Sequence, residues 1–141
     1  VIQRVRSASV SIDGKEISII NKGLLVLIGV EKDDSSEDLD YLVKKTVGLR
    51  IFKDENVNMN LSISHVGGEV LVVSQFTLCA DTNKGRRPSF IKAAAPEIAE
   101  NIYRSRYSPS TTSSALDLIA YWYWLLLQET HFPRFPIRTR G

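Results

Sequence analysis

The chain has very few of the residues from which disulfides and metal centres are built. Its 141 residues include one cysteine, Cys79, and two histidines, His65 and His131. A single cysteine excludes an intramolecular disulfide and is typical of proteins from a reducing compartment. Neither histidine has a cysteine or carboxylate at a spacing typical of metal sites. We therefore expect no metal and no cofactor, and we interpret Cys79 as a small packed residue rather than a nucleophile.

Long hydrophobic runs and a signal peptide are also missing from the sequence. The apolar run Leu118–Leu127 is far shorter than the roughly 20 residues that a helix needs to span a bilayer. The first residues do not show the pattern of a secretory signal. We therefore expect a protein of the cytoplasm that does not enter a membrane.

The charge is nearly balanced, so composition alone does not indicate a nucleic-acid partner. The net charge is +2 overall, with −1 over residues 1–103 and +3 over residues 104–141. Any RNA contact in the first part must therefore come from a local basic patch rather than from the field of the whole chain. An ordinary solvated loop is an equally good interpretation of such a patch. The candidate cations are Lys84, Arg86, Arg87 and Lys92.

Length and composition predict one domain, residues 1–141, with strands and helices interspersed in an α+β fold. The chain is 43% hydrophobic, which is enough for a packed core. The uninterrupted apolar run Leu24–Ile28 predicts a central strand covered on both faces. Ser35 is expected to cap a helix that stops at Gly48. The other expected features are a hairpin over residues 1–20 with an Asp13-Gly14 turn, a strand over Leu49–Phe52, a strand over Gly67–Leu78, a helix over Ala93–Tyr103, and a buried helical stripe of Leu39, Leu42, Val43, Thr46 and Val47.

One expected strand changes from apolar to polar at its end. Val70–Val73 has the pattern of a buried strand, and Ser74, Gln75 and Thr77 follow it. After Leu78 comes a loop with turn residues and three cations. Polar groups at a strand end that face a basic loop are a common way to build a site on a rigid frame. The alternative is a strand that simply leaves the core, with its hydroxyl groups bonded to nearby backbone.

The same stretch resembles the signature of a known enzyme family. Ser74-Gln-Phe-Thr-Leu78, followed by Arg86-Arg-Pro-Ser-Phe90, is similar to the signature of the D-aminoacyl-tRNA deacylases. Further stretches fit the same family in the same order, and the likeness runs from Val1 to about Tyr103. These stretches are Val1–Val5, Gly23–Val30 with Glu31–Asp34, Asn58–Asn60, and Ala95-Pro96.

The resemblance implies a fold, a reaction and partners. The implied fold is a three-layer β/β/α sandwich with mostly antiparallel and mixed sheets and two helices. The implied reaction is hydrolysis of the ester that joins a D-amino acid to the 3′-terminal adenosine of tRNA, which keeps D-amino acids out of translation. The implied partners are the aminoacylated 3′ end of tRNA and a second copy of the chain, because the family builds each pocket at a two-fold interface.

The resemblance also implies the residues that surround the reacting ester. The backbone N–H groups of Phe76 and Thr77 would lie close to the carbonyl, and Ser74 and Gln75 would fix the terminal adenosine and the loop. Thr77 is the usual candidate for chemistry, but a threonine hydroxyl without a neighbouring base is a poor nucleophile. We therefore expect the 2′-hydroxyl of the RNA to help position or activate water, with Thr77 in a binding role.

Contacts with tRNA are expected from the first strand, from the Asn58–Asn60 stretch and from the basic loop. Three of the candidate residues have structural alternatives: Phe76 as a core residue, Met59 as a gap filler and Arg4 as the partner of an acid. The residues expected to bind substrate or tRNA are Arg4, Met59, Lys84, Arg86, Arg87, Pro88 and Phe90.

Residues 104–141 do not resemble the family. Its members end with an Asn-x-Gly-Pro-Val-Thr stretch, whose Gly-Pro pair enters the partner's pocket and screens the chirality of the amino acid. Here no glycine lies between Gly85 and Gly141, and Pro133 and Pro136 both follow phenylalanine. We interpret this segment as aberrant, through a reading-frame shift or a sequence error. The alternative is a divergent tail that packs as a last strand or helix, with Ser108–Ser114 as a linker.

Three functions therefore follow from the sequence. The first is an esterase that removes D-amino acids from tRNA. The second is a tRNA-binding or interaction domain on the same frame, impaired in catalysis because the Gly-Pro pair is missing. The third is a general acyl hydrolase that uses Ser74, which the absence of a G-x-S-x-G nucleophile elbow disfavours.

Overall fold

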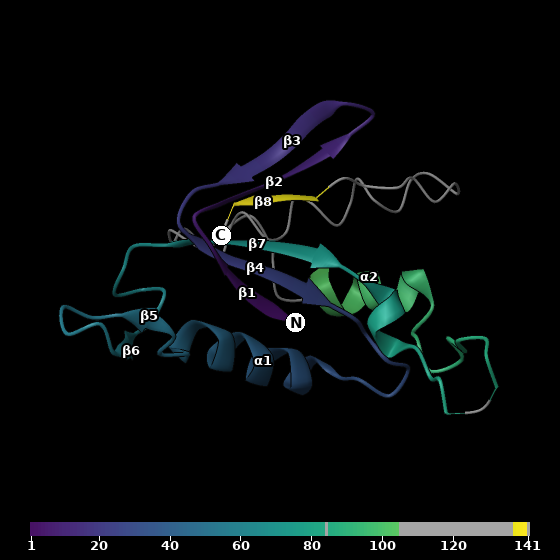
Figure 1. Ribbon diagram of the computed structural model, residues 1–141. Helices are drawn as coiled ribbons and strands as arrows, with labels where there is room; N and C mark the ends of the chain where they lie inside the picture. Colours follow the sequence, from purple (N-terminus) through teal and green to yellow (C-terminus); the bar gives the residue numbers. More distant parts are fainter. Residues whose placement is uncertain (84, 105–136, 141) are drawn as a thin grey trace.

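The computed structural model describes residues 1–83, 85–104 and 137–140, which form three layers. Two small β-sheets are stacked face to face, and helix α1 (Ser36–Gly48) lies against the outer face of one of them (Figure 1). This is the α+β fold that the sequence predicts, in the β/β/α arrangement that the resemblance implies. The predictions for Lys84, for Ser108–Ser114 and for residues 118–127 lie outside the described residues.

The central sheet has β4 in its middle and consists of β1 (Ile2–Val5), β4 (Gly23–Ile28) and β7 (Glu69–Ser74). β4 is antiparallel to β1 and parallel to β7, and Ile28 is paired with Ser74 where both strands end. The prediction of a central strand covered on both faces is confirmed. Leu24 and Leu25 point to opposite faces, as alternation in a strand requires, and each is buried in a different cluster.

The second sheet has the order β3-β2-β8 and consists of β2 (Ser7–Ile12), β3 (Lys15–Ile20) and β8 (Ile137–Arg140). The predicted turn Asp13-Gly14 joins β2 to β3 with φ values of 49° and 78°, both positive as a type I′ turn requires. The prediction of a single hairpin over residues 1–20 is wrong, because the chain changes sheets at Arg6. Val5 consequently faces the same core as Ala8 and Val10, although strict alternation would put it on the other face.

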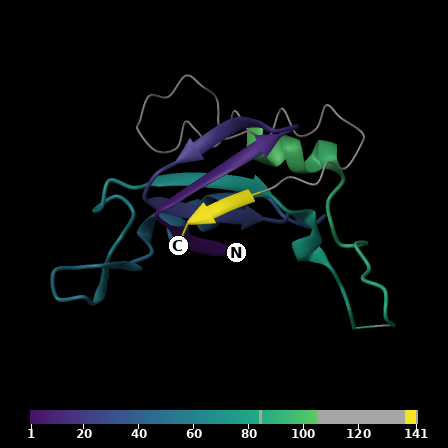
Figure 2. The same ribbon diagram turned by 45° about the horizontal axis from the view of Figure 1, so that its top comes forward.

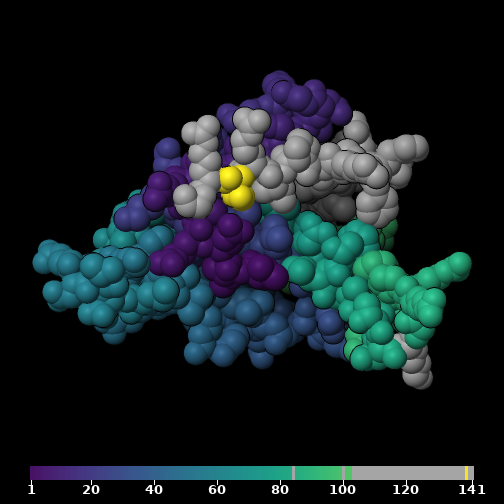
Figure 3. Space-filling model, in the orientation of Figure 1, coloured from purple at the N-terminus to yellow at the C-terminus, as the bar shows by residue number. Residues whose placement is uncertain are grey.

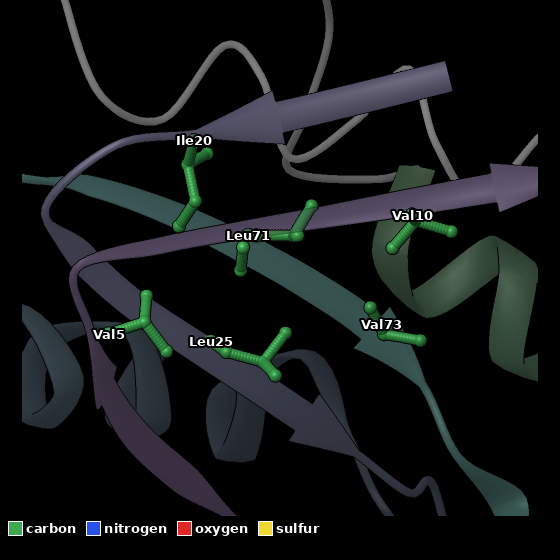
Figure 4. Packing of buried hydrophobic residues seen from close by; sticks show 7 residues of the cluster. Val5, Val10, Ile20, Leu25, Leu71 and Val73 are labelled. Carbon is green, nitrogen blue, oxygen red and sulfur yellow. The ribbon is translucent and has the colours of Figure 1, made fainter. Parts of the chain in front are cut away.

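The main hydrophobic core lies between the two sheets. Figure 2 shows β2 and β3 lying across β4 and β7, and Figure 4 shows aliphatic side chains of both sheets meeting between them. Burying a side chain of this size contributes about 1.5–3 kcal/mol relative to leaving it exposed. The buried members of this core are Val5, Ala8, Val10, Ile20, Leu25, Leu71 and Val73.

Helix α1 covers the other face of the central sheet. Val47 packs against a cluster that contains Leu24 and Val70, while Leu39 is buried with Val30. The same second cluster receives Ala99 from helix α2 (Pro96–Arg104). The first part of α1 and helix α2 therefore meet near the C-terminal end of β4, where the candidate site lies.

The start of α1 is as predicted, but two other details of the helix are wrong. Ser35 is the N-cap and forms a reciprocal capping box with Asp38. Gly48 is the last helical residue instead of the residue after the helix, and Leu49 is the C-cap. Leu42 is 47% exposed, because the face of α1 turned to the sheet is narrower than the apolar stripe.

The remaining elements differ from the predictions mainly at their ends. β5 (Phe52–Lys53) and β6 (Met59–Leu61) form a short ribbon at the end of the central sheet opposite the C-terminus of β7 (Figures 1 and 2). Helix α2 begins at Pro96 rather than at Ala93, because Ala93 forms a β-bridge with Glu31. The segment interpreted as aberrant contributes β8, which pairs antiparallel with β2. Within the described ranges, no helix has the length and apolarity needed to cross a membrane.

Candidate active site

The candidate site begins where the parallel ladder between β4 and β7 ends. The last bond of this ladder joins the Gln75 N–H to the Ile28 carbonyl at 2.7 Å. The chain then turns into η1 (Phe76–Cys79), in which the Leu78 N–H donates to the Gln75 carbonyl at 3.1 Å. The predicted strand Gly67–Leu78 is therefore too long: it begins at Glu69, ends at Ser74, and is followed by a 3-10 turn.

The amides of Phe76 and Thr77 open this turn. A 3-10 helix uses its first N–H groups for no bond inside the helix, so these two amides lead the turn at the strand end. The Gln75 side chain, which caps no helix amide, donates through Nε2 to the Thr77 hydroxyl oxygen. Among the described residues, no carboxylate and no imidazole is hydrogen-bonded to Thr77. The Thr77 hydroxyl is thus held as an acceptor, and none of the described residues offers it a hydrogen-bonded base.

The structure brings the two halves of the signature together. The rings of Phe76 and Phe90 meet edge to face, with centroids 5.3 Å apart and an interplanar angle of 63°. Phe76 is 37% and Phe90 38% exposed, so this pair lies at the surface rather than in the core. The structural alternative of Phe76 as a core residue is therefore wrong, and an aromatic surface adjoins the amides that open η1.

Between η1 and Phe90 the chain forms a hairpin-like basic loop. Asp81 and Ser89 exchange backbone hydrogen bonds of 2.8 and 2.9 Å, which close the base of the loop. Gly85 has a φ of 80°, a value that a side chain disfavours. Arg86, Arg87 and Pro88 are exposed on this loop, which projects from the surface well away from the β5–β6 ribbon (Figure 3).

One further cation of the patch is partly engaged within the loop. Lys92 Nζ lies 4.0 Å from the Asp81 carboxylate, and both side chains are substantially exposed to solvent. Ion pairs of this kind contribute about 0–1 kcal/mol. Lys92 therefore remains available to a phosphate, and Arg86 and Arg87 are also exposed on the described part of the loop.

Arg4 and Met59 do not lie beside Thr77. Arg4 pairs with Leu24, near the start of β4, and its guanidinium donates to the Ile51 carbonyl at 2.7 Å. This backbone contact replaces the acid partner considered from the sequence. Met59 opens β6 at the far end of the central sheet and is 61% exposed, so it fills no packing gap.

Cys79 and His65 are both occupied in structural contacts. Burial, with the nearby charges of Glu31 and Asp34, raises the pKa of the Cys79 thiol, which therefore stays protonated at neutral pH. His65 Nδ1 accepts from the Ser62 backbone N–H at 3.2 Å and lies 2.6 Å from the Ser62 hydroxyl oxygen. In the part of the chain that the structure describes, no three His, Cys, Asp or Glu side chains are grouped to hold a metal ion.

η1 packs against Gly29, a residue that was not among the predicted site residues. Gly29 follows β4 directly, and a Cβ at this position would lie 2.9 Å from the Cys79 Sγ and 3.1 Å from the Gln75 carbonyl oxygen. A single glycine placed immediately after an otherwise apolar central strand was the signal of such a close approach.

Comparison with known proteins identifies relatives for most of the chain. A family model described as D-Tyr-tRNA(Tyr) deacylase matches residues 1–116. A D-aminoacyl-tRNA deacylase of Desulfatibacillum aliphaticivorans is 62% identical over 103 residues, which cover 73% of this chain and 70% of the relative. A D-aminoacyl-tRNA deacylase of Clostridioides difficile (strain 630) is 59% identical over 103 residues, which cover 73% and 69%.

Two solved structures share the fold. The structure titled "c-Myc DNA Unwinding Element Binding Protein" has a TM-score of 0.74 and 30% sequence identity, and the match covers 99% of this chain and 89% of that one. A structure described as a probable eukaryotic D-amino acid tRNA deacylase has a TM-score of 0.60 and 20% identity, covering 72% and 60%. The curated relatives match over the same N-terminal part that the sequence motifs indicate.

Proposed function

The chain belongs to the D-Tyr-tRNA(Tyr) deacylase family, and from this premise we propose that it hydrolyses the ester bond of D-aminoacyl-tRNA, releasing a free D-amino acid and tRNA. It is an enzyme of the deacylase class, since several curated relatives at 56–62% identity carry that name. Removal of D-amino acids before they reach the ribosome is the proposed role, and the cytoplasm, where aminoacyl-tRNA is used, is the proposed location.

The observation that carries this proposal is the contact between Phe76 and Phe90, which joins the two halves of the signature around the start of η1. In ester hydrolysis, water attacks the carbonyl carbon and negative charge grows on the carbonyl oxygen. Fixed N–H donors aimed at that oxygen stabilise the transition state without reorganisation. We assign this role to the amides of Phe76 and Thr77, because they open a turn that the β4–β7 ladder anchors.

The leaving group of the reaction is the 3′ oxygen of the terminal ribose. As the tetrahedral intermediate collapses, the bond from the carbonyl carbon to this oxygen breaks, and the oxygen takes up a proton. The products are the D-amino acid and a tRNA with a free 3′-hydroxyl. We propose that the neighbouring 2′-hydroxyl positions the attacking water, because no base of the described residues is bonded to Thr77.

The side chains around these amides are proposed to bind the substrate. The Gln75–Thr77 hydrogen bond supports a role of Gln75 in orienting Thr77, and Ser74 would contact the terminal adenosine. The exposed Arg86 and Arg87 would meet phosphates of the acceptor end, since guanidinium groups bind phosphate oxygens in pairs. The aromatic surface at Phe90 offers a stacking partner for a base or ribose.

We also propose a homodimer, in which a second copy completes the substrate site at the C-terminal ends of β4 and β7. Arg4 and Met59 lie away from Thr77 of the same chain. They would therefore contact either the substrate bound by the second copy or a part of the tRNA farther from the ester. Light scattering of the full chain tests this proposal: a mass of twice 15.8 kDa is expected, and a monomer at micromolar concentration contradicts it.

The reaction is tested by the release of D-tyrosine from D-tyrosyl-tRNA, with L-tyrosyl-tRNA as the control. Hydrolysis of the D-ester with the L-ester left intact is the expected result. Hydrolysis of both esters would show a deacylase that has lost chiral discrimination. Binding of tRNA without turnover would support the second function, a catalytically impaired tRNA-binding domain, which the absence of a Gly-Pro pair in residues 104–141 favours.

A further inference from the structure

The segment that follows β4 contacts both η1 and the residues that follow the basic loop. This segment, Gly29–Lys32, contacts η1 on one side and the end of the basic loop on the other. The Val30 carbonyl accepts from the Cys79 thiol at 3.6 Å and from the Ala94 N–H at 2.9 Å. The Lys32 N–H donates to the Lys92 carbonyl at 3.0 Å. One short segment thus fixes where η1 and the end of the loop lie relative to each other.

The contact with η1 requires that position 29 has no side chain. A Cβ on Gly29 would meet three atoms of the turn region: Cys79 Sγ at 2.9 Å, the Gln75 carbonyl oxygen at 3.1 Å and Leu78 Cβ at 3.3 Å. The backbone of Gly29 does not have a positive φ, so its conformation is open to any residue. Space alone therefore demands glycine here.

The turn has little freedom to move away from such a side chain. Cys79 is 7% exposed and is held against Val30, which is itself buried with Leu39 and Ala99. The Gln75 carbonyl is the acceptor that closes η1, through Leu78. A shift of either atom is passed directly to Phe76 and Thr77, which lie between them in the chain.

We infer that Gly29 and Cys79 are positioning residues of the deacylase. Their close contact sets the distance between η1 and the end of β4, and thereby the direction in which the Phe76 and Thr77 N–H groups point. This inference rests on the proposed function for its catalytic consequence. Neither residue touches the substrate. The effect passes through the turn, where a displacement of about 1 Å is enough to cost on the order of 10²-fold in rate.

The test is a double-mutant cycle at the two positions. Gly29→Ala is expected to lower kcat for D-tyrosyl-tRNA at least about tenfold, while the Kd for uncharged tRNA changes less than about twofold, because the loop arginines are untouched. In the double variant with Cys79→Ala, the Sγ that lies 2.9 Å from the new Cβ is absent. The loss in kcat caused by Gly29→Ala is therefore expected to be at least about threefold smaller in the Cys79→Ala background than in the wild type. Gly48→Ala is the matched control, because a Cβ there meets nothing within 4 Å.

Amide NMR spectra of the same variants separate this inference from the proposed function. In Gly29→Ala the resonances of Phe76–Cys79 are expected to shift, and in the double variant they return towards their original positions, whether or not the protein hydrolyses the ester. If Gly29→Ala does not fold and the double variant does, folding itself demonstrates the overlap. Wild-type kcat and unshifted resonances in Gly29→Ala, or no recovery in the double variant, would overturn the inference.

Discussion

Replacement of Thr77 by alanine separates two accounts of the chemistry. In one, the Thr77 hydroxyl attacks the ester and forms a covalent intermediate. In the other, which we propose, the hydroxyl, which accepts a hydrogen bond from Gln75, helps to bind the substrate. Thr77→Ala removes the hydroxyl and leaves the backbone amide in place, so it deletes only the function that distinguishes these accounts.

The expected loss follows from one exposed hydrogen bond. Such a bond contributes about 0.5–1.5 kcal/mol, and about 1.4 kcal/mol corresponds to a tenfold change in rate. Thr77→Ala should therefore lower kcat/KM about 2- to 13-fold, with little change in stability because Thr77 is exposed. Removal of a true nucleophile costs on the order of 10⁴- to 10⁶-fold, so the two accounts differ by several orders of magnitude.

The assay is single-turnover release of D-tyrosine from D-tyrosyl-tRNA, with tRNA binding measured in parallel. Thr77→Ser is the matched control, since it keeps the hydroxyl and should stay close to the wild-type rate. A loss of more than about a thousandfold in Thr77→Ala, with binding and fold intact, would show that the hydroxyl does chemistry and would refute the reasoning.

Three other residue changes follow from particular contacts. Val57 has a φ of 66°, which costs a β-branched residue about 1–3 kcal/mol, so Val57→Gly should raise the free energy of unfolding by about 1 kcal/mol in urea titration, whereas Val57→Ala should not. Hydrogen bonds from the Ser35 hydroxyl and N–H lower the pKa of Asp38 below its ordinary value of 3.8. The ionised carboxylate therefore stabilises the protein above pH 3.8, and this stabilisation is lost as the pH falls through the lower pKa of the folded state. The difference in unfolding free energy between the wild type and Asp38→Asn should disappear between these two pH values. Replacing Arg86 or Arg87 by alanine should weaken tRNA binding and reduce the salt slope by about 0.7–0.9 each, and an unchanged slope would remove them from the RNA interface.

Features with a local cause could be predicted from the sequence. An uninterrupted run of aliphatic residues made Leu24–Ile28 a buried central strand, because only a strand covered on both faces tolerates such a run. Ser35 followed by Asp38 supplied both partners of a capping box. Asp13-Gly14 supplied the two residues that accept positive φ in a hairpin turn.

Features with a distant cause could not be predicted. The residues Phe76–Leu78 continue the β-type sequence pattern of β7. The neighbouring sequence does not indicate that β4, the partner strand, ends at Ile28, whose carbonyl accepts the last hydrogen bond of the ladder. The chain must then satisfy its backbone in a 3-10 turn. Leu42 is a similar case, because its helical spacing fits a buried stripe although it is 47% exposed, and how α1 docks on the sheet is not contained in its local pattern.

The candidate site was predictable to a similar extent. The sequence indicated a polar strand end that faces a basic loop, and in the structure Phe76, just after that strand end, meets Phe90, at the end of the loop. Their support by Gly29 could not be derived, since it depends on the distance between Gly29 and Cys79, which are fifty positions apart in the sequence. The position of Arg4 at the other end of β4 likewise follows from the antiparallel register of β1, which sequence motifs do not contain.

The account depends on the amides of Phe76 and Thr77 receiving the ester carbonyl. The most direct measurement is an amide NMR titration of the full chain with D-tyrosine linked to 3′-amino-3′-deoxyadenosine through an amide bond that resists hydrolysis. We expect downfield shifts of the Phe76 and Thr77 N–H resonances that saturate together with binding. Saturable binding that leaves both resonances in place, while amides elsewhere shift, would contradict it.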